Sequence, residues 1–376
     1  MFIMRSTYTI TCHNVYNYGA TLQAYALQQY LLARKVNNVI INYMPCYLNW
    51  HYHLKWWVSP RSSYYRKVKY NPLFRLVYVT IRYLVDLRTY SRKRNFDRFT
   101  SKQLKLTKRC TNIAEIEDVV KDANLLIAGS DQIWNSYNLI NGTDSAFYLS
   151  FGPDNAKRVS YAASFGANQI DAKLEEFVKS NLHKFCKLSV REQSGVEVLK
   201  KLGFQADVVL DPVFLLSKEE WVRKLNLKSD NKEYILVYNL GEENREICEF
   251  TKSLHDITGL KIISIFGKVH LKWCDEIQDA GPIEFLSMIY NASYVITNSF
   301  HASAFSIILK KEFFSFSYNK SKASTRICEM LKTYNLLNRY NPNQDVMLKK
   351  IDYDTIEDNL ECRISQSKKW LESILN

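Results

Sequence analysis

The chain has 376 residues and is 47% hydrophobic, which excludes an intrinsically disordered protein and allows a sizeable core. Single cores stop growing near about 250–300 residues, so this length predicts two domains. No uncharged apolar stretch reaches the roughly 18 residues of a membrane span, and the first ten residues lack a signal-peptide pattern. The eight cysteines are scattered singly, which favours reduced thiols in a cytoplasmic protein over disulfides or a zinc site.

The net charge of +13 is concentrated in one basic, aromatic segment. Residues 51–110 hold 16 Lys and Arg against two Asp, which gives +14, and the other 316 residues sum to −1. The middle of the segment, 72–96, predicts a helix that is apolar nearly all round, with Arg75, Arg82 and Asp86 on one side. Such a helix is typical of a membrane surface, but a dimer face or an arm packed on the body fits as well. No motif supports nucleic-acid binding.

The first half alternates strands and helices, apart from the basic segment. Its predicted strands are 7–12, 37–43, 124–130, 156–166, 187–190 and 206–211, and its predicted helices are 21–35, 113–121, 171–183 and 192–202. This βαβ order predicts a parallel sheet. Asp211-Pro212 breaks the chain after the last strand, and we place a domain boundary there.

The second half repeats the alternation. Its predicted strands are 233–240, 260–267, 293–298 and 312–317, and its predicted helices are 244–257, 282–292, 300–309, 324–333 and 355–373. We therefore predict an α/β protein with two Rossmann-like domains facing across a cleft. They cover 1–211, with the basic helical insertion at 51–110, and 212–345, and a helical tail follows at 346–376.

Polar loops that follow strands are the candidate sites, because ligands of open α/β sheets bind beyond the carboxyl ends of the strands. These loops cover residues 13–19, 129–135, 164–168, 190–193, 239–244, 267–273 and 298–303.

The loop at 298–303 places a histidine at the start of a helix. Asn298 or Ser299 can cap this helix, whose free N–H groups and dipole form an anion site. His301 and Ser303 would project from the first turn toward the cleft. This arrangement predicts a proton donor beside a bound anion.

Three further loops offer ligand groups. Arg191 ends a strand and can fork onto a carboxylate or phosphate, unless it is a surface residue paired with a nearby Glu. Lys320, Lys322 and Arg326 lie before or at a helix start, where they could complete an anion pocket or form a solvated positive face. Asn14, Asn17 and Gly19 form the loop before the first helix, and Gly19 would let the backbone approach a ligand. The loop lacks the GxGxxG pattern of dinucleotide sites.

The loop at 129–135 has the composition of a sugar site. Ser130, Asp131 and Gln132 could bond hydroxyl groups, and Trp134 could stack on the sugar ring. A helix cap at Asp131 and a packed Trp134 explain the same residues equally well.

Several stretches, taken in their order, resemble the polysaccharide pyruvyl transferase family across roughly 7–340. They are NYGATLQAYALQQYL, LLIAGSDQIWN, VSYAASFG, SVREQSGVEVLKKLG, VVLDPVFLL and VITNSFHASAFSIILKKEFF. The resemblance implies a fold like that of the GT-B glycosyltransferases. It also implies that His301, Arg191 and Arg326 serve the donor. Many family members carry Gly-Asp where this chain has Gly19-Ala20, which puts any carboxylate role there in doubt.

The same resemblance implies a function. It implies transfer of the pyruvyl group of phosphoenolpyruvate onto a sugar as a ketal, with the N-terminal domain on the acceptor side and the C-terminal domain on the donor side. Together with the basic segment, it leads us to expect a lipid-diphosphate-linked acceptor at the inner face of a bacterial membrane. Phosphoenolpyruvate is then the donor substrate, and we expect no cofactor and no metal.

Two other classes of function stay open. A nucleotide-sugar glycosyltransferase shares the fold and would need a ribose-binding acid, for which Glu284 or Glu329 could serve. A sugar-binding, membrane-associated protein without catalysis is the other alternative. The acceptor sugar and the oligomeric state do not follow from the sequence.

Overall fold

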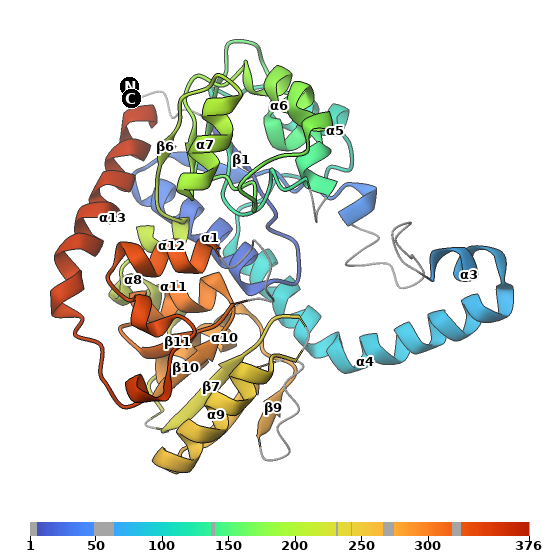
Figure 1. Cartoon of the computed structure of the whole chain (residues 1–376). Coiled ribbons are helices and arrows are strands. Elements are labelled where there is room, and N and C mark those ends of the chain that lie inside the picture. Colours follow the sequence, from blue (N-terminus) through green and yellow to red (C-terminus); the bar gives the residue numbers. More distant parts are fainter. Residues whose placement is uncertain are drawn as a thin grey trace.

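The computed structural model describes residues 6–48, 64–136, 140–230, 232–241, 243–265, 274–317 and 325–375 (Figure 1). Part of the basic segment (51–63), the whole predicted loop 267–273, and both Lys320 and Lys322 lie outside the described residues.

The first half is built on a parallel sheet, as predicted. Its strands are β1 (Ser6–Ile10), β2 (Asn37–Ile40), β3 (Leu125–Ala128) and β4 (Lys157–Ser160), in the order β2-β1-β3-β4. Two short strands, β5 (Ser189–Val190) and β6 (Asp207–Val208), pair with each other, and single bridges join β5 to the chain around β4.

The predicted strand 156–166 is much shorter in the structure. After β4 the chain leaves the sheet, because Ala162 adopts a left-handed conformation with φ of 53°. Only Ala163 bridges back, to Asp131 and Val190. The loops after β3, β4 and β5 are thereby held together.

The helices of the first half lie near their predicted positions. They are α1 (Tyr18–Ala33), α5 (Ile113–Val119), α6 (Glu175–Leu182) and α7 (Gln193–Lys201). Asn17 caps α1 by accepting a hydrogen bond from the Ala20 N–H at 3.2 Å. Most of α1 is buried, because it is packed between the first sheet and the second half of the chain.

The second half contains a second parallel sheet. Its strands are β7 (Tyr234–Tyr238), β8 (Lys261–Ile265), β9 (Asp275–Ile277), β10 (Tyr294–Thr297) and β11 (Glu312–Ser315), in the order β11-β10-β7-β8-β9. The helices are α8 (Lys218–Leu225), α9 (Arg245–Thr258), α10 (Pro282–Asn291), α11 (Phe300–Ile308) and α12 (Thr325–Thr333). The sequence analysis did not predict β9 or α8.

A continuous apolar core joins the two halves through α1. Tyr18 stacks on Phe285 of α10 with ring centroids 4.3 Å apart, and Tyr25 packs against Trp221 of α8. Domains joined by a large hydrophobic interface move little relative to one another. Side chains from both halves can therefore form one preformed site.

The basic segment forms two helices, α3 (Tyr65–Tyr70) and α4 (Pro72–Gln103). The end of α4 belongs to the body, where Phe96 and Phe99 are buried and Arg92 donates to the Tyr16 carbonyl oxygen at 2.7 Å. Its beginning, with α3, projects away from the body (Figure 1). None of the described helices combines the length and apolar character that crossing a bilayer requires.

The last helix, α13 (Asp354–Leu375), returns to the first half. Trp370, Leu371 and Ile374 pack among Leu27, Leu31 and other residues of that half, so the predicted helical tail contributes to its core. The Trp370 indole N–H donates to Asp207 at 2.7 Å.

Truncating Trp370 should therefore destabilise the whole protein. We expect Trp370→Ala to cost about 3–5 kcal/mol, as for other large core truncations, and to lower the melting temperature by several degrees. The neighbouring exposed Lys369→Ala should change stability by less than about 0.5 kcal/mol. Equal melting temperatures of the two variants would contradict the packing of α13.

Candidate functional site

The site lies where the two sheets reverse their strand order. Such switch points, between β1 and β3 and between β7 and β10, are the usual ligand sites of open α/β sheets. The helix that follows β1 is α1, and the helix that follows β10 is α11. The first turns of these two helices meet, which brings Gly19 against His301.

Gly19 is required by this contact. A Cβ atom at Gly19 would lie 2.0 Å from Nδ1 of His301, far inside van der Waals distance. The Gly19 backbone was predicted to approach a ligand, whereas in the structure it lies against the imidazole of His301. Ser299 caps α11 by accepting from the Ala302 N–H, so the position of His301 is fixed from both helices.

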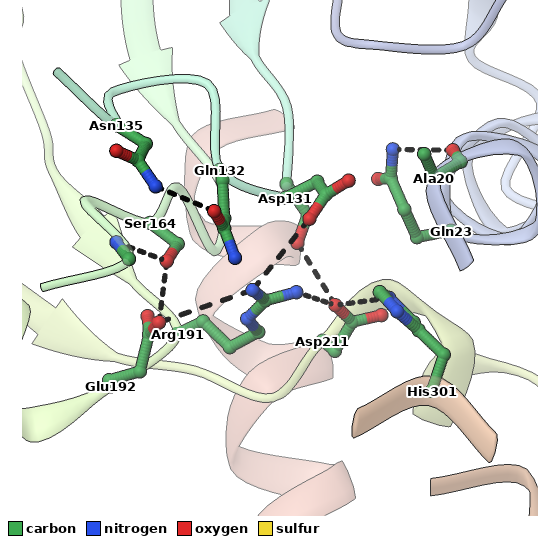
Figure 2. A network of polar contacts seen from close by, with 12 residues as sticks. Ala20, Gln23, Asp131, Gln132, Asn135, Ser164, Arg191, Glu192, Asp211 and His301 are labelled. Atoms are coloured by element: carbon green, nitrogen blue, oxygen red, sulfur yellow. Dashed lines mark hydrogen bonds and ion pairs between the residues drawn. The ribbon is translucent and has the colours of Figure 1, made fainter. Parts of the chain in front are cut away.

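Asp211 joins the predicted catalytic residues (Figure 2). Its Oδ2 accepts a hydrogen bond from Arg191 Nη1 at 2.7 Å and lies 3.4 Å from His301 Nε2. Ser130 donates to the same oxygen at 3.2 Å. Burial alone would raise the pKa of Asp211, but His301 and Arg191 outweigh it and hold this pKa well below its usual range. Asp211 is therefore a buried anion.

Arg191 is almost fully buried among acidic groups. Besides Asp211, carboxylate oxygens of Asp131 and Glu192 lie 3.8 and 4.0 Å from its Nη2. Burial lowers the pKa of Arg191, yet these three carboxylates outweigh burial and raise it overall. Its guanidinium carbon also lies 4.7 Å from the Phe300 ring centroid, in cation–π contact with the second half.

Arg326 approaches the same point from the start of α12. With the carbonyl oxygen of Gln132 turned toward it, Arg326 donates from both terminal nitrogens, at 2.8 and 2.5 Å. Within the described chain, no carboxylate lies within ion-pair distance of Arg326. Burial, followed by the positive charge of Arg191, lowers the pKa of Arg326. The carboxylates of Glu192, Asp131 and Asp211 offset this only in part, so the charge of Arg326 is poorly compensated.

Buried donors beside a cavity are unused in this arrangement. Nε and Nη2 of Arg191 and Nε of Arg326 have no hydrogen-bond partner among the described residues. Both arginines line a cavity of about 250 Å³, together with Asp211, Glu192 and Glu329. Pockets for drug-sized ligands are about 300–1,000 Å³, so this cavity suits a small metabolite.

Further basic and apolar groups complete the cavity. Lys332 and Arg363 add two positive charges, and Phe214, Phe300 and Met330 add apolar wall. The arrangement can hold a small anion beside Asp211. His301 does not line this cavity, but its Nε2 lies 3.4 Å from Oδ2 of Asp211, which does.

Ser164 and Glu192 support the network from the first half. Ser164 donates to Oε1 of Glu192 at 2.5 Å and accepts from the Gly166 N–H at 3.0 Å (Figure 2). Asp131 adopts φ of 72°, a strained conformation of the kind that collects at functional sites.

Some side chains that were candidates for ligand contact are instead buried and bond within the protein. Trp134 is fully buried, stacks on Tyr148 and donates to the Phe147 carbonyl oxygen, so of the two alternatives the structure has the packed Trp134 and not the sugar-stacking one. Ser303 is also fully buried, and its hydroxyl bonds to Ser299 and Ser315. It does not face the cleft as predicted.

The other predicted residues divide into two groups. Ser130 is fully buried and holds Asp211, and Asn17 caps α1. Asn14, Asp131 and Gln132 are partly exposed, so they remain candidates for contact with a ligand.

The sequence analysis missed Asp211 as a site residue. The sequence pattern around Asp211-Pro212 was interpreted as a chain break only, although Asp211 ends the predicted strand 206–211 and Arg191 directly follows the predicted strand 187–190. The rule about loops after strands would have found it. Of the acids considered for a ribose site, Glu284 accepts from the Gly281 N–H and caps α10, whereas Glu329 lies in the cavity with a pKa raised by burial.

No group of three or more His, Cys, Asp or Glu side chains in the described ranges has the arrangement of a metal site.

Comparison with known proteins agrees with this architecture. The model of the polysaccharide pyruvyl transferase family matches residues 17–320. No curated protein sequence matches the chain. The UDP-GlcNAc 2-epimerase of Methanocaldococcus jannaschii, solved with UDP-GlcNAc and UDP, is 13% identical over 99% of both chains, with a TM-score of 0.51. The enzyme from Neisseria meningitidis is 10% identical over 99% of this chain and 100% of that one, with a TM-score of 0.49. The Methanocaldococcus jannaschii enzyme is a GT-B fold protein, and the likeness to it confirms the predicted fold class.

Replacing the buried Asp211 should destabilise the protein in a pH-dependent way. Removing one partner of a buried ion pair costs about 3–5 kcal/mol, and we expect the lower end for Asp211→Asn because Arg191 keeps Asp131 and Glu192 nearby. The folded pKa of Asp211 is depressed, so the advantage of the native residue is present above the unfolded pKa of about 3.9 and declines below it.

Melting temperatures measured at about pH 7 and about pH 3 test whether the stability advantage of Asp211 declines in acid. The gap between native protein and Asp211→Asn should narrow in acid, whereas the exposed Asp358→Asn should show almost no gap at either pH. A gap that is constant or widens in acid would show that Asp211 is not a buried anion.

Proposed function

Because the chain belongs to the polysaccharide pyruvyl transferase family, we propose that it moves the pyruvyl group of phosphoenolpyruvate onto a sugar of a lipid-linked bacterial polysaccharide precursor. The product would be a ketal, and phosphate would be released. The observation that carries the proposal is the combination of unused arginine donors in a small cavity with a histidine whose Nε2 lies 3.4 Å from a buried carboxylate.

The charges of the site favour a small dianion or trianion as donor. Phosphoenolpyruvate carries a carboxylate and a phosphate, which arginine forks bind well. Arg326 offers the more available charge, because Arg191 is already balanced by three carboxylates. Bound anion would also relieve the repulsion between the two arginines that lowers the pKa of Arg326.

His301 is suited to move the protons. Its Nε2 faces Asp211, so in the neutral ring Nε2 would carry the hydrogen. Nδ1, which lies beside Gly19 in the first turn of α1, would accept and return a proton. One sugar hydroxyl attacks C2 of phosphoenolpyruvate and gives its proton to the base, and a proton is added to C3, which becomes a methyl group. The bond between C2 and the phosphate oxygen then breaks, the second hydroxyl attacks C2, and its proton leaves with phosphate. The bonds and protons of this proposed reaction balance without a cofactor or metal.

The acceptor would enter along the partly exposed side chains of the first half. Asn14, Asp131 and Gln132 can exchange hydrogen bonds with sugar hydroxyls. The lipid-diphosphate carrier is proposed from the family resemblance and the basic segment.

Binding of the donor should depend on Arg326. Saturating phosphoenolpyruvate at about 100 times Kd should add about 2.7 kcal/mol of stability, visible as a raised melting temperature. Arg326→Gln should lose this shift, because it removes a poorly compensated charge without leaving a buried acid unpaired. Arg191→Lys should weaken binding roughly ten-fold or more, since lysine lacks the fork.

The control is Lys121→Gln, whose side chain is exposed, pairs with Asp118 and precedes β3 instead of following the carboxyl end of a strand. UDP- and GDP-sugars are titrated in parallel. A shift with a nucleotide sugar and none with phosphoenolpyruvate would replace the proposal with glycosyl transfer. Donor binding without phosphate release for any acceptor would favour a binding protein.

Turnover should depend on His301 and on the space that Gly19 leaves for it. His301→Ala should lower phosphate release by roughly 10²–10⁴-fold while donor binding persists. Gly19→Ala should also lose most activity, because the added methyl group must displace the imidazole. Alanine is otherwise favourable inside a helix, so the protein should stay folded. Full activity of either variant would remove His301 from the mechanism.

A further inference from the structure

An exposed apolar surface on the projecting part of the basic segment is unexplained by the proposed site. We call residues 64–90 the arm; it contains α3 and the beginning of α4 (Figure 1). The described residues include fourteen large hydrophobic side chains that are exposed, and nine of them lie in this 27-residue stretch. They are Tyr64, Tyr70, Leu73, Leu76, Val77, Ile81, Tyr83, Leu84 and Tyr90.

The aliphatic members form one face of α4. Leu73, Leu76, Val77, Ile81 and Leu84 follow each other at spacings of three, one, four and three residues, the pattern of a single helical stripe. Each is at least 51% exposed. A soluble helix normally buries such a stripe, so this face is built to be covered by something outside the described chain.

The charges of the arm indicate what covers it. The arm carries six Lys and Arg and a single Asp. Lys67 and Lys69 lie over the rings of Phe74, Tyr65 and Tyr70, so basic and aromatic groups are interleaved. A second copy of the arm would bring two strongly positive surfaces together, which opposes a dimer through this face.

We propose that the arm docks on the surface of an anionic lipid bilayer. The aliphatic stripe would enter the boundary between headgroups and acyl chains, and the Lys and Arg side chains would contact lipid phosphates, as in other interfacial helices. Tyrosine is also enriched at this depth of a membrane. The proposal concerns a surface outside the catalytic site and does not depend on the proposed reaction.

The helix α4 connects the arm to the loop that precedes Gly19, so docking of the arm would position the site relative to the bilayer. The helix α4 continues without a break into the body, where Arg92 donates to the Tyr16 carbonyl oxygen and to the Tyr18 hydroxyl. Asn95 donates to the Asp279 carbonyl oxygen at 2.8 Å. Tyr16 lies in the loop that leads to Gly19, so the docked arm would hold this entrance of the site near the bilayer. There a lipid-linked sugar could reach the site without leaving the membrane.

Co-sedimentation of the full chain with vesicles tests the proposal. Vesicles of phosphatidylcholine alone are compared with vesicles that contain phosphatidylglycerol, at low salt. We expect binding to the anionic vesicles, weakened by salt. Leu76→Ser/Ile81→Ser/Leu84→Ser should abolish it. Arg66→Gln/Lys67→Gln/Lys69→Gln/Arg75→Gln should lower the partition coefficient roughly a hundred-fold or more, since each charge contributes about five-fold.

A matched control makes the same kinds of substitution, Leu to Ser and Lys to Gln, at exposed positions outside the arm. Leu348→Ser/Lys201→Gln removes an exposed leucine and an exposed lysine elsewhere, and it should bind like the native protein. Light scattering without lipid is measured for every variant, with melting temperatures to confirm folding. Partitioning that the arm substitutions leave unchanged would overturn the proposal. A dimer that the stripe substitutions dissolve, without lipid binding, would assign the face to a second copy and overturn it as well.

Discussion

The buried carboxylate of Asp211 is the constraint on which the site depends. It holds Arg191 from the first half and His301 from the second, and it has no exposed surface. An isolated carboxylate would not stay ionised in such a place, because losing its hydration costs several kcal/mol. It is therefore stable only when both halves are assembled around it. The same ion pairs that offset its burial orient the imidazole and the guanidinium.

The apolar helix α1 makes this assembly possible. It shares one core with α8, α10 and α11, so the relative position of the halves is set by packing rather than by a flexible linker. Its first turn then brings Gly19 into contact with His301, at a distance that no other residue type tolerates. A polar network this tight needs such a rigid support, because a shift of about 1 Å at a reacting group can cost a hundred-fold in rate.

The sequence predicted the parts of this structure that local patterns encode. Alternating strands and helices predicted two parallel sheets, and the rule about loops after strands led to His301, Arg191 and Gln132. It could not reveal partners that only the tertiary fold brings together. Asp211 meets His301 ninety positions later in the chain, and α13 packs on the first half because the chain crosses back. The sequence could not decide whether Trp134 stacks on a sugar or packs in the core, because an indole in either role can have the same sequence neighbours.

The distribution of charge gives the two arginines of the site, Arg191 and Arg326, different roles. Outside residues 51–110 the chain is nearly neutral, and even the buried Arg191 is balanced by carboxylates. That balance fixes geometry but leaves little attraction for a ligand. Arg326 differs, because its hydrogen-bond partner Gln132 is neutral and its neighbour Arg191 repels it. A charge held in this way gains more from an incoming anion than a paired one does, since no existing ion pair must first be broken. Arg191 is therefore mainly an organiser of the network, and Arg326 is the group with the most to gain from an anionic donor.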